Sequence, residues 1–468
     1  MTAPVIVVGA GPVGLMLAGE LRLGGVEVIV LERREEPSGE SRGLGFTARA
    51  TEIFEQRGLL SRFGTVETSP QGHFGGIPMD YSVLPGSHFG ARGIPQHRIE
   101  SMLEDWACEL GAEVLRGHEV VGVRQNAGGV VAIVDDGDGL VEFDGSYLVA
   151  CDGGRSTVRG LAGFDFPGTE ATREMYLADV VGRNIRPRFI GERVPGGMVM
   201  SAPLEPGVDR IIVCERETPH RDRGEAPGFA EVADAWQRLT GESLHGADTR
   251  WVSAFTDATR QVTEYRRGRF LVAGDAAHTH LPAGGQGLSL GVQDAVNLGW
   301  KLAATVRGWA APDLLDTYHS ERHPVGARVL RNTRAQGHLY LSGAEVEPLR
   351  EVVAELIRIP EVGRHLSGMV SGLDIRYDVG SGTHPLLGRR LPGAALPTGR
   401  GLLTGPAADA AADWATRIEL RPGGEPVLVR PDGYVVWAGG DGLDEALRRW
   451  FGEPKSVTER QLESCTAP

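Results

Sequence analysis

The sequence predicts an α/β protein built on an open, mainly parallel sheet. Residues 5–8 form a short β-branched run that suits a buried strand, and a glycine turn and a helical pattern follow at once. Two later apolar strands also end in glycine-associated polar clusters, at Asp152 and at Asp275. Strand ends of this kind meet at one edge of a parallel sheet, where ligands bind.

The turn after the first strand has the spacing of a dinucleotide site. Gly9, Gly11 and Gly14 lie in G-A-G-P-V-G, a helix follows over 15–23, and the strand "EVIVLE" ends on Glu32. Glycines permit the tight turn and the approach of backbone to a pyrophosphate, and the helix N-terminus favours its charge. A carboxylate closing the second strand suits an unphosphorylated adenosine ribose. FAD or NAD therefore fits this pocket better than NADP.

A second glycine pattern, Gly39-Glu40-Ser41-Arg42-Gly43, matches the G-x-S-x-G of hydrolases. That motif requires a strand running directly into the turn. Here "RREEPSGE" precedes the serine and indicates a solvated loop. We therefore expect Arg42 and Gly43 to be loop residues near the dinucleotide.

The next elements are a helix and several strands. "RIESMLEDWACELG" has an apolar stripe of helical period and indicates a core helix that ends at Gly111. Valines alternate with polar residues in "EVLRGHEVVGV", "GVVAIVDDG" and "GLVEFDGSYLVACDGG". These runs predict a small antiparallel sheet with one wet face.

Three strand ends, near Gly9, Asp152 and Asp275, would surround one extended ligand. Glycines 284, 285 and 287 precede a helix that we expect to start near Leu290. The Asp275 carboxylate suits a polyol hydroxyl, and the helix amides suit an electron-rich carbonyl or a developing anion. A ribityl chain and a flavin ring match this description.

Two other interpretations are open at these positions. His278 and His280 form an H-x-H that could bind a metal, but no third ligand is evident nearby, which favours a hydrogen-bonded loop histidine. Asp152 could equally cap a turn in "DGGRS". We expect no metal.

Length and composition set the broad class. A chain of 468 residues suggests two or three domains, and a net charge of −14 argues against nucleic acid or an anionic membrane as partner. The four cysteines are scattered without a C-x-x-C pair, no basic leader precedes the first strand, and no apolar run reaches about 20 residues. We expect a cytoplasmic protein. The cysteines are Cys108, Cys151, Cys214 and Cys465.

The ordered motifs resemble the class A flavoprotein monooxygenases, and within them the bacterial aromatic polyketide hydroxylases of angucycline and anthracycline type. The segments that carry the resemblance are "GAGPVGLMLAGELRLGGVEVIVLERR", "SRGLGFTARATEIFEQRGLL", "PQHRIESMLEDWA", "VACDGGRSTVR", "EMYLADV", "RQVTEYRRGRFLVAGDAAHTHLPAGGQG" and "LLDTYHSERHPVG". The resemblance implies a Rossmann-like, three-layer FAD-binding domain of the para-hydroxybenzoate hydroxylase type, a β-rich substrate domain and a shortened thioredoxin-like C-terminal domain. Their expected ranges are 1–70, 98–175 and 265–335; 71–97, 176–264 and 336–387; and 388–468.

The same resemblance implies an activity. FAD would stay bound, NADPH would bind transiently as reductant, and dioxygen would form a flavin C4a-hydroperoxide that hydroxylates a polycyclic aromatic polyketide in antibiotic biosynthesis. No second G-x-G-x-x-G is present, so NADPH has no dinucleotide domain of its own. A Baeyer–Villiger or ring-opening oxygenase, and a flavin-binding cyclase or scaffold without redox turnover, are the alternatives. A homodimer is among the expected assemblies.

The resemblance also implies site residues, while no acid–base catalyst stands out. Ser289 departs from the family, which usually has asparagine there, and this puts the tightness of flavin binding in question. The residues implied in cofactor binding are Gly9, Gly11, Pro12, Val13 and Gly14 at the pyrophosphate; Glu32 and Arg33 at the adenosine; Arg42, Gly43 and Gln96 at the ribityl–pyrophosphate region; Val120; Asp152 and Gly153 for FAD and NADPH; Asp275 at the ribityl chain; and Pro282, Gly285, Gly287, Leu288 and Ser289 at the flavin ring.

Two further regions complete the prediction. The insert 176–264 indicates β-strands and a helix at "FAEVADAWQRL", with Met198 and Met200 either lining a dry lid or forming core. The C-terminal region predicts a strand–turn–strand in "PVLVRPDGYVVWA" and a helix in "GLDEALRRWFG", after an Ala/Gly/Pro-rich stretch at 393–412 that shortens it. Without C-x-x-C this region cannot be redox-active, so a structural or dimerisation role remains.

Overall fold

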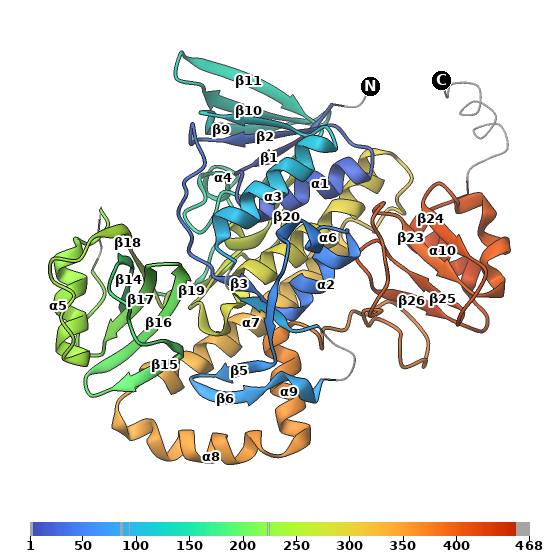
Figure 1. Ribbon diagram of the computed structural model, residues 1–468. Coiled ribbons are helices and arrows are strands. Elements are labelled where there is room, and N and C mark those ends of the chain that lie inside the picture. Colours follow the sequence, from blue (N-terminus) through green and yellow to red (C-terminus); the bar gives the residue numbers. More distant parts are fainter. Residues whose placement is uncertain (1–2, 85–87, 93, 222, 224, 455–468) are drawn as a thin grey trace.

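The computed structural model describes residues 3–84, 88–92, 94–221, 223 and 225–454. Its central element is a mixed sheet (Figure 1). Its order is β20-β21-β12-β1-β2-β8, and all neighbours are parallel except β20 and β21. The strands are β1 (Val5–Val8), β2 (Val28–Glu32), β8 (Glu113–Arg116), β12 (Tyr147–Ala150), β20 (Arg266–Arg267) and β21 (Phe270–Val272). This confirms the predicted α/β class.

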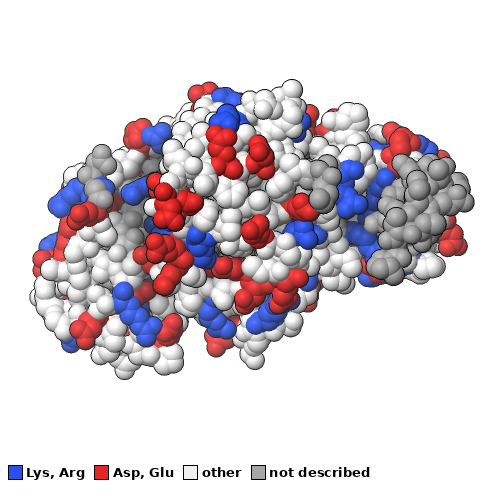
Figure 2. Space-filling model, turned by 90° about the horizontal axis from the view of Figure 1, so that it is seen from above, with Lys and Arg blue, Asp and Glu red and all other residues white. Residues whose placement is uncertain are grey.

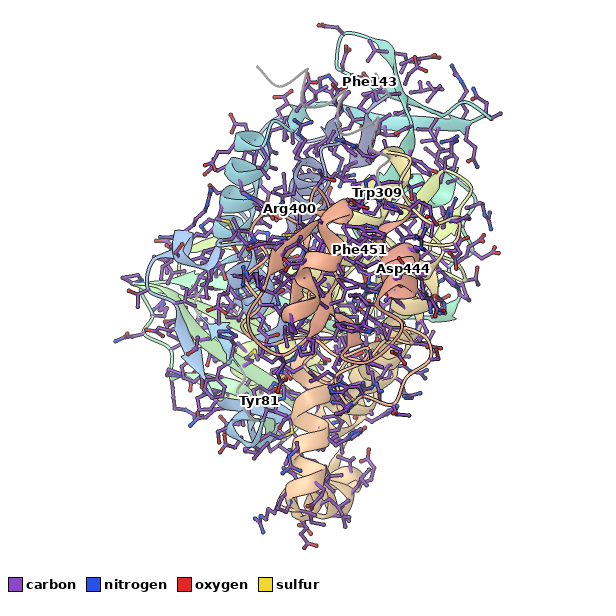
Figure 3. The ribbon with its side chains drawn as sticks, turned by 90° about the vertical axis from the view of Figure 1, so that its right-hand side faces the viewer. Tyr81, Phe143, Trp309, Arg400, Asp444 and Phe451 are labelled. Atoms are coloured by element: carbon purple, nitrogen blue, oxygen red, sulfur yellow. The ribbon has the colours of Figure 1, made fainter. Side chains whose placement is uncertain are left out.

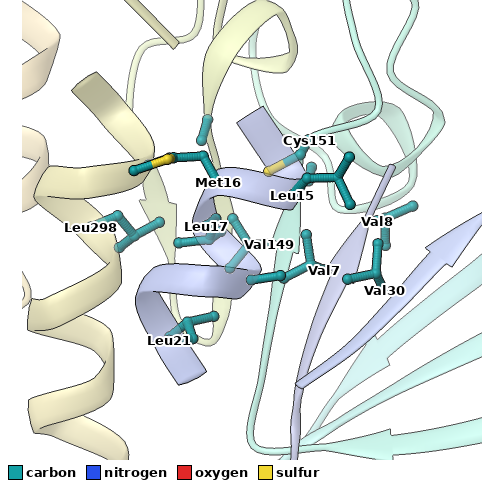
Figure 4. Packing of buried hydrophobic residues seen from close by; sticks show 14 of the residues in the cluster. Val7, Val8, Leu15, Met16, Leu17, Leu21, Val30, Val149, Cys151 and Leu298 are labelled. Atoms are coloured by element: carbon teal, nitrogen blue, oxygen red, sulfur yellow. The ribbon is translucent and has the colours of Figure 1, made fainter. Parts of the chain in front are cut away.

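Helices cover one face of this sheet, and an antiparallel sheet covers the other, which gives three layers (Figure 1). The helices are α1 (Pro12–Leu23), α3 (Gln96–Glu109) and α6 (Gln286–Val306), and the antiparallel strands are β9 (Glu119–Gln125), β10 (Val130–Asp135) and β11 (Leu140–Gly145). Leu15, Leu17 and Leu21 of α1 are fully buried between the sheet and Leu298 of α6 (Figure 4). Glycines allow the helices to approach, since a Cβ on Gly299 would lie 2.4 Å from Cβ of Glu20.

The prediction for residues 113–150 was partly wrong. The antiparallel sheet is present, but residues 113–116 and 147–150 belong to the parallel sheet as β8 and β12. β12 is buried along its whole length, as a central parallel strand is, and its partners β1 and β21 lie far away in the sequence. Alternation of valines with polar residues could not show this pairing, although the polar cluster at Asp152 had indicated that the second of these strands ends at the edge of the parallel sheet.

A second body of the fold is an antiparallel sheet with the order β15-β16-β17-β14-β18, which confirms the predicted β-rich insert. Its strands are β14 (Glu174–Val181), β15 (Arg188–Val194), β16 (Gly197–Glu205), β17 (Val208–Glu215) and β18 (Thr249–Thr256). Helix α5 (Phe229–Thr240) covers one face and buries Trp236 completely.

Smaller elements connect the two bodies. The long helix α7 (Thr317–Leu341) runs through residue 335, where a domain boundary was expected, and so is shared by both parts. The remaining strands and α-helices before the C-terminal domain are β3 (Gly45–Phe46), β4 (Glu67–Ser69), β7 (Gly90–Arg92), the hairpin β5 (Gln71–Phe74) and β6 (Ile77–Asp80), β13 (Gly168–Thr169), β19 (Thr259–Gln261), β22 (His278–Thr279), α2 (Ala48–Gln56), α4 (Thr157–Leu161), α8 (Glu347–Ile357) and α9 (Pro360–Ser371).

The C-terminal domain is a sheet of order β24-β23-β25-β26 with a helix packed on it (Figure 3). β23 is parallel to β24 and antiparallel to β25, as in a thioredoxin-like sheet. The predicted hairpin and helix are confirmed as β25, β26 and α10. The elements are β23 (Gly401–Thr404), β24 (Ile418–Arg421), β25 (Val427–Val429), β26 (Val435–Ala438) and α10 (Leu443–Phe451).

The stretch 393–412 was expected to be a shortened front to this domain, yet it contains the central strand β23. Leu402 and Leu403 are buried between glycines, and a 3-10 helix, Pro406–Trp414, follows with Ala411 in the core. The Ala/Gly/Pro-rich composition of this stretch gave no indication of the four-residue strand β23.

Two properties of the surface follow from this fold. Acidic and basic side chains are intermingled on the face seen in Figure 2. Across the residues described, the structure contains no helix of the length and apolarity that crossing a membrane requires. Cys108, Cys151 and Cys214 are free thiols, and Cys465 lies outside the described residues.

Candidate cofactor site

The three polar strand ends lie side by side, because β21, β12 and β1 are parallel neighbours in the sheet. A Cβ on Gly9 would lie 2.6 Å from the carbonyl oxygen of Cys151, which directly precedes Asp152. A Cβ on Gly274 would lie 2.8 Å from Cγ2 of Val13 in the first turn of α1. The topology therefore produces the convergence that the sequence indicated.

The three glycines of the first turn have different surroundings. Gly9 has φ +104°, and a Cβ on Gly14 would lie 1.9 Å from the Gly9 carbonyl oxygen, so the protein itself requires both. Gly11 has an ordinary φ of −79° and open space within 4 Å of a built Cβ. Helix α1 begins at Pro12 without a side-chain cap. Its free amides and the space above Gly11 fit a pyrophosphate.

Glu32 lies beside this turn at the end of β2. Its Oε2 accepts a hydrogen bond from the amide of Ala10 at 2.8 Å, and its Oε1 accepts one from the amide of Arg34 at 3.1 Å. The half-buried carboxylate is thus held at the edge of the cradle, where it can accept from a ribose. Arg33 is exposed next to it, whereas Val120 is a buried core residue of β9.

The loop containing Arg42 is tied to the start of α3. The Gly43 amide donates to Gln96 Oε1 at 3.3 Å, and the Gln96 amide donates to the Gly43 carbonyl at 3.2 Å. Ser41 is buried, accepts from the His97 amide at 3.2 Å and hydrogen-bonds to Nδ1 of the His97 ring at 2.8 Å. No strand precedes Ser41 in the described loop, so it has no nucleophile elbow. Sequence reasoning missed this Ser–His pair, which holds the exposed Arg42 in place.

Asp152 caps a turn, as one of the two sequence interpretations had it. Its Oδ2 accepts from the Val158 amide at 3.1 Å, its Oδ1 accepts from the Ser156 hydroxyl, and burial raises the pKa of the carboxyl. Both oxygens are therefore engaged inside the protein. Gly153 follows with φ +81° and open space around a built Cβ, which leaves room for a ligand above the turn.

Asp275 has the opposite character. It is exposed at the end of β21, and no group among the described residues hydrogen-bonds to its carboxylate. Gly274 before it has φ +63° and turns the chain out of the strand. A free carboxylate in this position is available for the hydroxyls of a polyol.

The glycine-rich loop that follows differs from the prediction in one respect. Helix α6 begins at Gln286, four residues before the expected start at Leu290, because Gly285 (φ +64°) forms its N-cap in the left-handed region. Gly287, Leu288 and Ser289 are therefore helical, and the first amides of α6 have neither intrahelical partners nor a side-chain cap at Gly285.

Ser289 is buried in the first turn of α6. Its Oγ accepts a hydrogen bond from the Thr47 amide at 2.8 Å. A cavity of about 20 Å³ adjoins it, lined by Thr47, Gln293 and Met369 among others. The hydroxyl thus joins α6 to the β3–α2 junction, a contact across 242 residues that sequence reasoning did not foresee.

The two histidines of the H-x-H do not form a metal pair. His278 is buried and its Nε2 lies 2.7 Å from Oδ2 of Asp294, while His280 Nδ1 hydrogen-bonds to the Leu281 carbonyl at 2.8 Å. Burial lowers the pKa of His280. In the part of the chain that the structure describes, no group of three or more potential ligand side chains could hold a metal ion.

Asp294 was not singled out from the sequence, although a lone aspartate in the apolar run "GVQDAVNLGW" was a usable signal. It is fully buried, and Arg322 Nε donates to its Oδ1 at 2.7 Å. Burial alone would raise the pKa of Asp294, but Arg322 and His278 hold it below its ordinary value. Asp294 is therefore an anchored anion behind the site.

An apolar wall faces the glycine-rich loop. Met198 pairs across the strands with Cys214, Met200 with Ile212, and Met175 with Phe255, all on the sheet face opposite α5. Leu281 and Ala283, on either side of Pro282, belong to the same cluster as these side chains. Met198 is buried and Met200 half-buried, so the two methionines form core and also wall the space beside the loop.

The assembled features fit FAD. The space above Gly11 and the uncapped start of α1 suit the pyrophosphate, and Glu32 suits the ribose. Asp275, which has no partner among the described residues, suits the ribityl chain, and the apolar wall beside α6 suits an apolar ring. Fold and site together define a flavin-binding protein.

Comparison with known proteins gives the family. The FAD binding domain family matches residues 2–333, and the family described as aromatic-ring hydroxylase, C-terminal matches residues 384–454. The chain belongs to the FAD-dependent aromatic monooxygenases.

Individual relatives cover almost the whole chain. A 12-dehydrotetracycline 5-monooxygenase/anhydrotetracycline 6-monooxygenase of Streptomyces rimosus subsp. rimosus is 44% identical over 97% of this chain and 100% of its own. The solved structure of CabE, an aromatic hydroxylase from angucycline biosynthesis, is 57% identical, covers 97% of this chain and 100% of its own, and has a TM-score of 0.93. A dialkyldecalin synthase of Streptomyces rugosporus is 40% identical over 97% of this chain and 99% of its own.

Proposed function

We propose that the protein is an NADPH-driven monooxygenase that inserts one oxygen atom of dioxygen into a polycyclic aromatic polyketide during antibiotic biosynthesis. Bound FAD supplies the redox chemistry, taking electrons from NADPH and activating dioxygen. The observation that carries the proposal is the apolar wall of Met175, Met198 and Cys214 packed against Leu281 beside the flavin-type loop.

The chain's own residues bind, orient and exclude water. Gly11 and the α1 amides hold the pyrophosphate, Asp275 holds the ribityl chain, and the first amides of α6 face the ring. The methionine-rich wall would keep water from the reacting atoms. Water would otherwise cause activated oxygen to be lost before it reaches the substrate. A phenolic substrate supplies its own electron density, so the proposal requires no acid–base residue from the chain.

NADPH consumption by the FAD-loaded protein tests this proposal. The rate should rise when a polycyclic phenol is added, and the product should be heavier by one oxygen atom. Formation of a lactone from a ketone substrate would instead show that the protein is a Baeyer–Villiger oxygenase. No stimulation by any polycyclic aromatic compound would count against oxygenation altogether.

One relative supports a second candidate, a cyclase that binds FAD without redox turnover. The dialkyldecalin synthase is about as similar to this chain as the monooxygenases are, and the solved structure of the Diels–Alderase PyrE3 is 39% identical with a TM-score of 0.86. This candidate predicts that NADPH does not bleach the bound flavin in the presence of any aromatic substrate. Anaerobic mixing followed by the visible absorption of FAD separates the two.

A further inference from the structure

Helix α6 contains a buried polar stripe that the cofactor site does not use directly. Asp294, Asn297 and Lys301 lie at i, i+3 and i+7 and are essentially inaccessible to solvent. They face Glu321 and Arg322 of α7, which are also buried. Buried polar groups of this kind are costly unless each is paired, so their arrangement fixes the position of the elements that bear them.

At its front end, this stripe holds both loops of the cofactor site. Asp294 Oδ2 accepts from the Gly274 amide at 3.2 Å and lies 2.7 Å from His278 Nε2, on either side of Asp275. Arg322 donates through Nε to Asp294 at 2.7 Å and through Nη2 to the Leu290 carbonyl in the first turns of α6 at 3.1 Å. The Asp294–Arg322 pair therefore sets the spacing between the Asp275 loop and the N-terminus of α6.

The third donor of Arg322 leads away from the site. Its Nη1 donates to the Tyr377 hydroxyl at 3.0 Å. Tyr377 lies just before the C-terminal domain and packs in the cluster that joins this domain to α6, with its ring centroid 4.3 Å from that of Tyr434. The guanidinium of Arg430, which follows β25, lies 5.4 Å from the Tyr377 ring. The fork of Arg322 thus joins the C-terminal domain to the two loops.

We propose that Asp294, Arg322 and Tyr377 are positioning residues through which the C-terminal domain sets the geometry of the FAD-contacting loops. All three are buried, and none is among the residues assigned above to the cofactor site. The C-terminal domain accordingly contributes to FAD affinity although it has no redox motif of its own. This proposal rests on FAD binding alone and is independent of which substrate is oxidised.

Two tyrosines offer a matched pair of variants. Tyr377→Phe removes the hydroxyl that accepts from Arg322 and leaves the ring in the cluster. Tyr434→Phe removes a buried hydroxyl that has no hydrogen-bond partner among the described residues, from the neighbouring ring. Both variants keep the packing of the domain, so neither is expected to prevent folding, whereas Asp294→Ala would leave Arg322 buried without its counter-ion.

FAD titration of the full-length apoprotein, followed by quenching of FAD fluorescence, is the primary measurement. We expect Tyr377→Phe to raise the Kd for FAD about fivefold, because the unpaired Arg322 donor shifts the fork that holds the loops. The visible absorption bands of bound flavin should shift as well. Tyr434→Phe should leave both within twofold of the wild type.

Thermal unfolding of the apoproteins measures the stability of each variant separately from its affinity for FAD. Equal FAD affinity and equal flavin spectra in Tyr377→Phe and the wild type would overturn the proposal, whatever happens to the apoprotein Tm. An equal rise of the Kd for FAD in both tyrosine variants would also overturn the proposal, since that result would show that the effect comes from a general loss of packing.

Discussion

Three carboxylates lie around the cofactor site, and their hydrogen bonds give them different roles. Glu32 accepts from two backbone amides and Asp152 caps its own turn, so both are partly committed to the fold. Asp275 is exposed and unpaired among the described residues. Residue type and spacing identified all three, but only the contacts show which one is free for a ligand.

Asp275→Ala should therefore affect FAD and leave the fold unchanged. Loss of a charged acceptor from the ribityl hydroxyls should raise the Kd for FAD about tenfold, while the free energy of unfolding of the apoprotein should change by less than about 0.5 kcal/mol. Isothermal titration and urea unfolding measure the two quantities. Asp313→Ala, at another exposed aspartate, is the control. Unchanged FAD affinity in Asp275→Ala would remove Asp275 from the site.

Ser289 has a structural task in the first turn of α6. Ser289→Ala would leave the Thr47 amide without its acceptor, so we expect a loss of about 1–2 kcal/mol in the free energy of unfolding. Ser320→Ala, on the exposed side of α7, should change it by less than about 0.5 kcal/mol. Equal stabilities of the two variants in urea would show that the Thr47 contact contributes nothing. The family resemblance indicated the missing asparagine, but nothing in the sequence predicted a contact across 242 residues.

At the scale of elements, local signals were reliable and non-local ones were not. The β1–turn–α1 unit and the C-terminal hairpin were predictable because glycine turns and apolar periods lie within each segment. The start of α6 was misplaced because the left-handed conformation of Gly285 leaves no trace in the period of the apolar residues. The strand β8 was misassigned because its partner is distant, whereas β12 was assigned to the antiparallel sheet by its alternation and to the parallel sheet by the polar cluster at its end.

The turn between β1 and α1 allows a test that separates folding from binding. Gly11→Ala places a methyl group in open space at an ordinary φ, so the apoprotein should lose less than about 1 kcal/mol. The same methyl would stand where the pyrophosphate approaches, and FAD affinity should fall at least tenfold. Gly14→Ala should instead destabilise the apoprotein, because its Cβ would lie 1.9 Å from the Gly9 carbonyl oxygen. Gly11→Ala that binds FAD normally would contradict the assignment of this turn.

For the whole molecule, a buried ionic network joins the C-terminal domain to the FAD-binding part. Arg430 donates to Glu321 and Asp432, Lys301 donates to Glu321 at 2.8 Å, and Asn297 donates to Asp432 at 3.1 Å. The Pro-Asp-Gly turn was predicted as a hairpin, yet nothing local shows that its charged residues enter the interior of another domain. Such networks are strongly destabilised when one partner is removed.

Glu321 makes this junction sensitive to acid. Burial would raise the pKa of Glu321, but Arg430 and Lys301 lower it from 4.5 to about 2. Burial also lowers the pKa of Lys301 to about 8, which leaves the lysine mostly protonated at neutral pH. Since Glu321 binds protons more tightly when the chain is unfolded, its contribution is complete above the unfolded pKa and is lost as pH falls through the folded one. That contribution amounts to about 3 kcal/mol.

Glu321→Gln removes the carboxylate that forms ion pairs with both Lys301 and Arg430. The variant should lose about 3–5 kcal/mol of unfolding free energy at neutral pH, because Lys301 and Arg430 remain buried with less counter-charge. From about pH 5 to about pH 2 the wild type should lose about 3 kcal/mol more stability than the variant does. Urea unfolding across this range measures both, with the exposed Glu351→Gln as control for the general effect of a lost carboxylate. Parallel pH profiles for wild type and Glu321→Gln would mean that Glu321 is not held ionised at the domain junction.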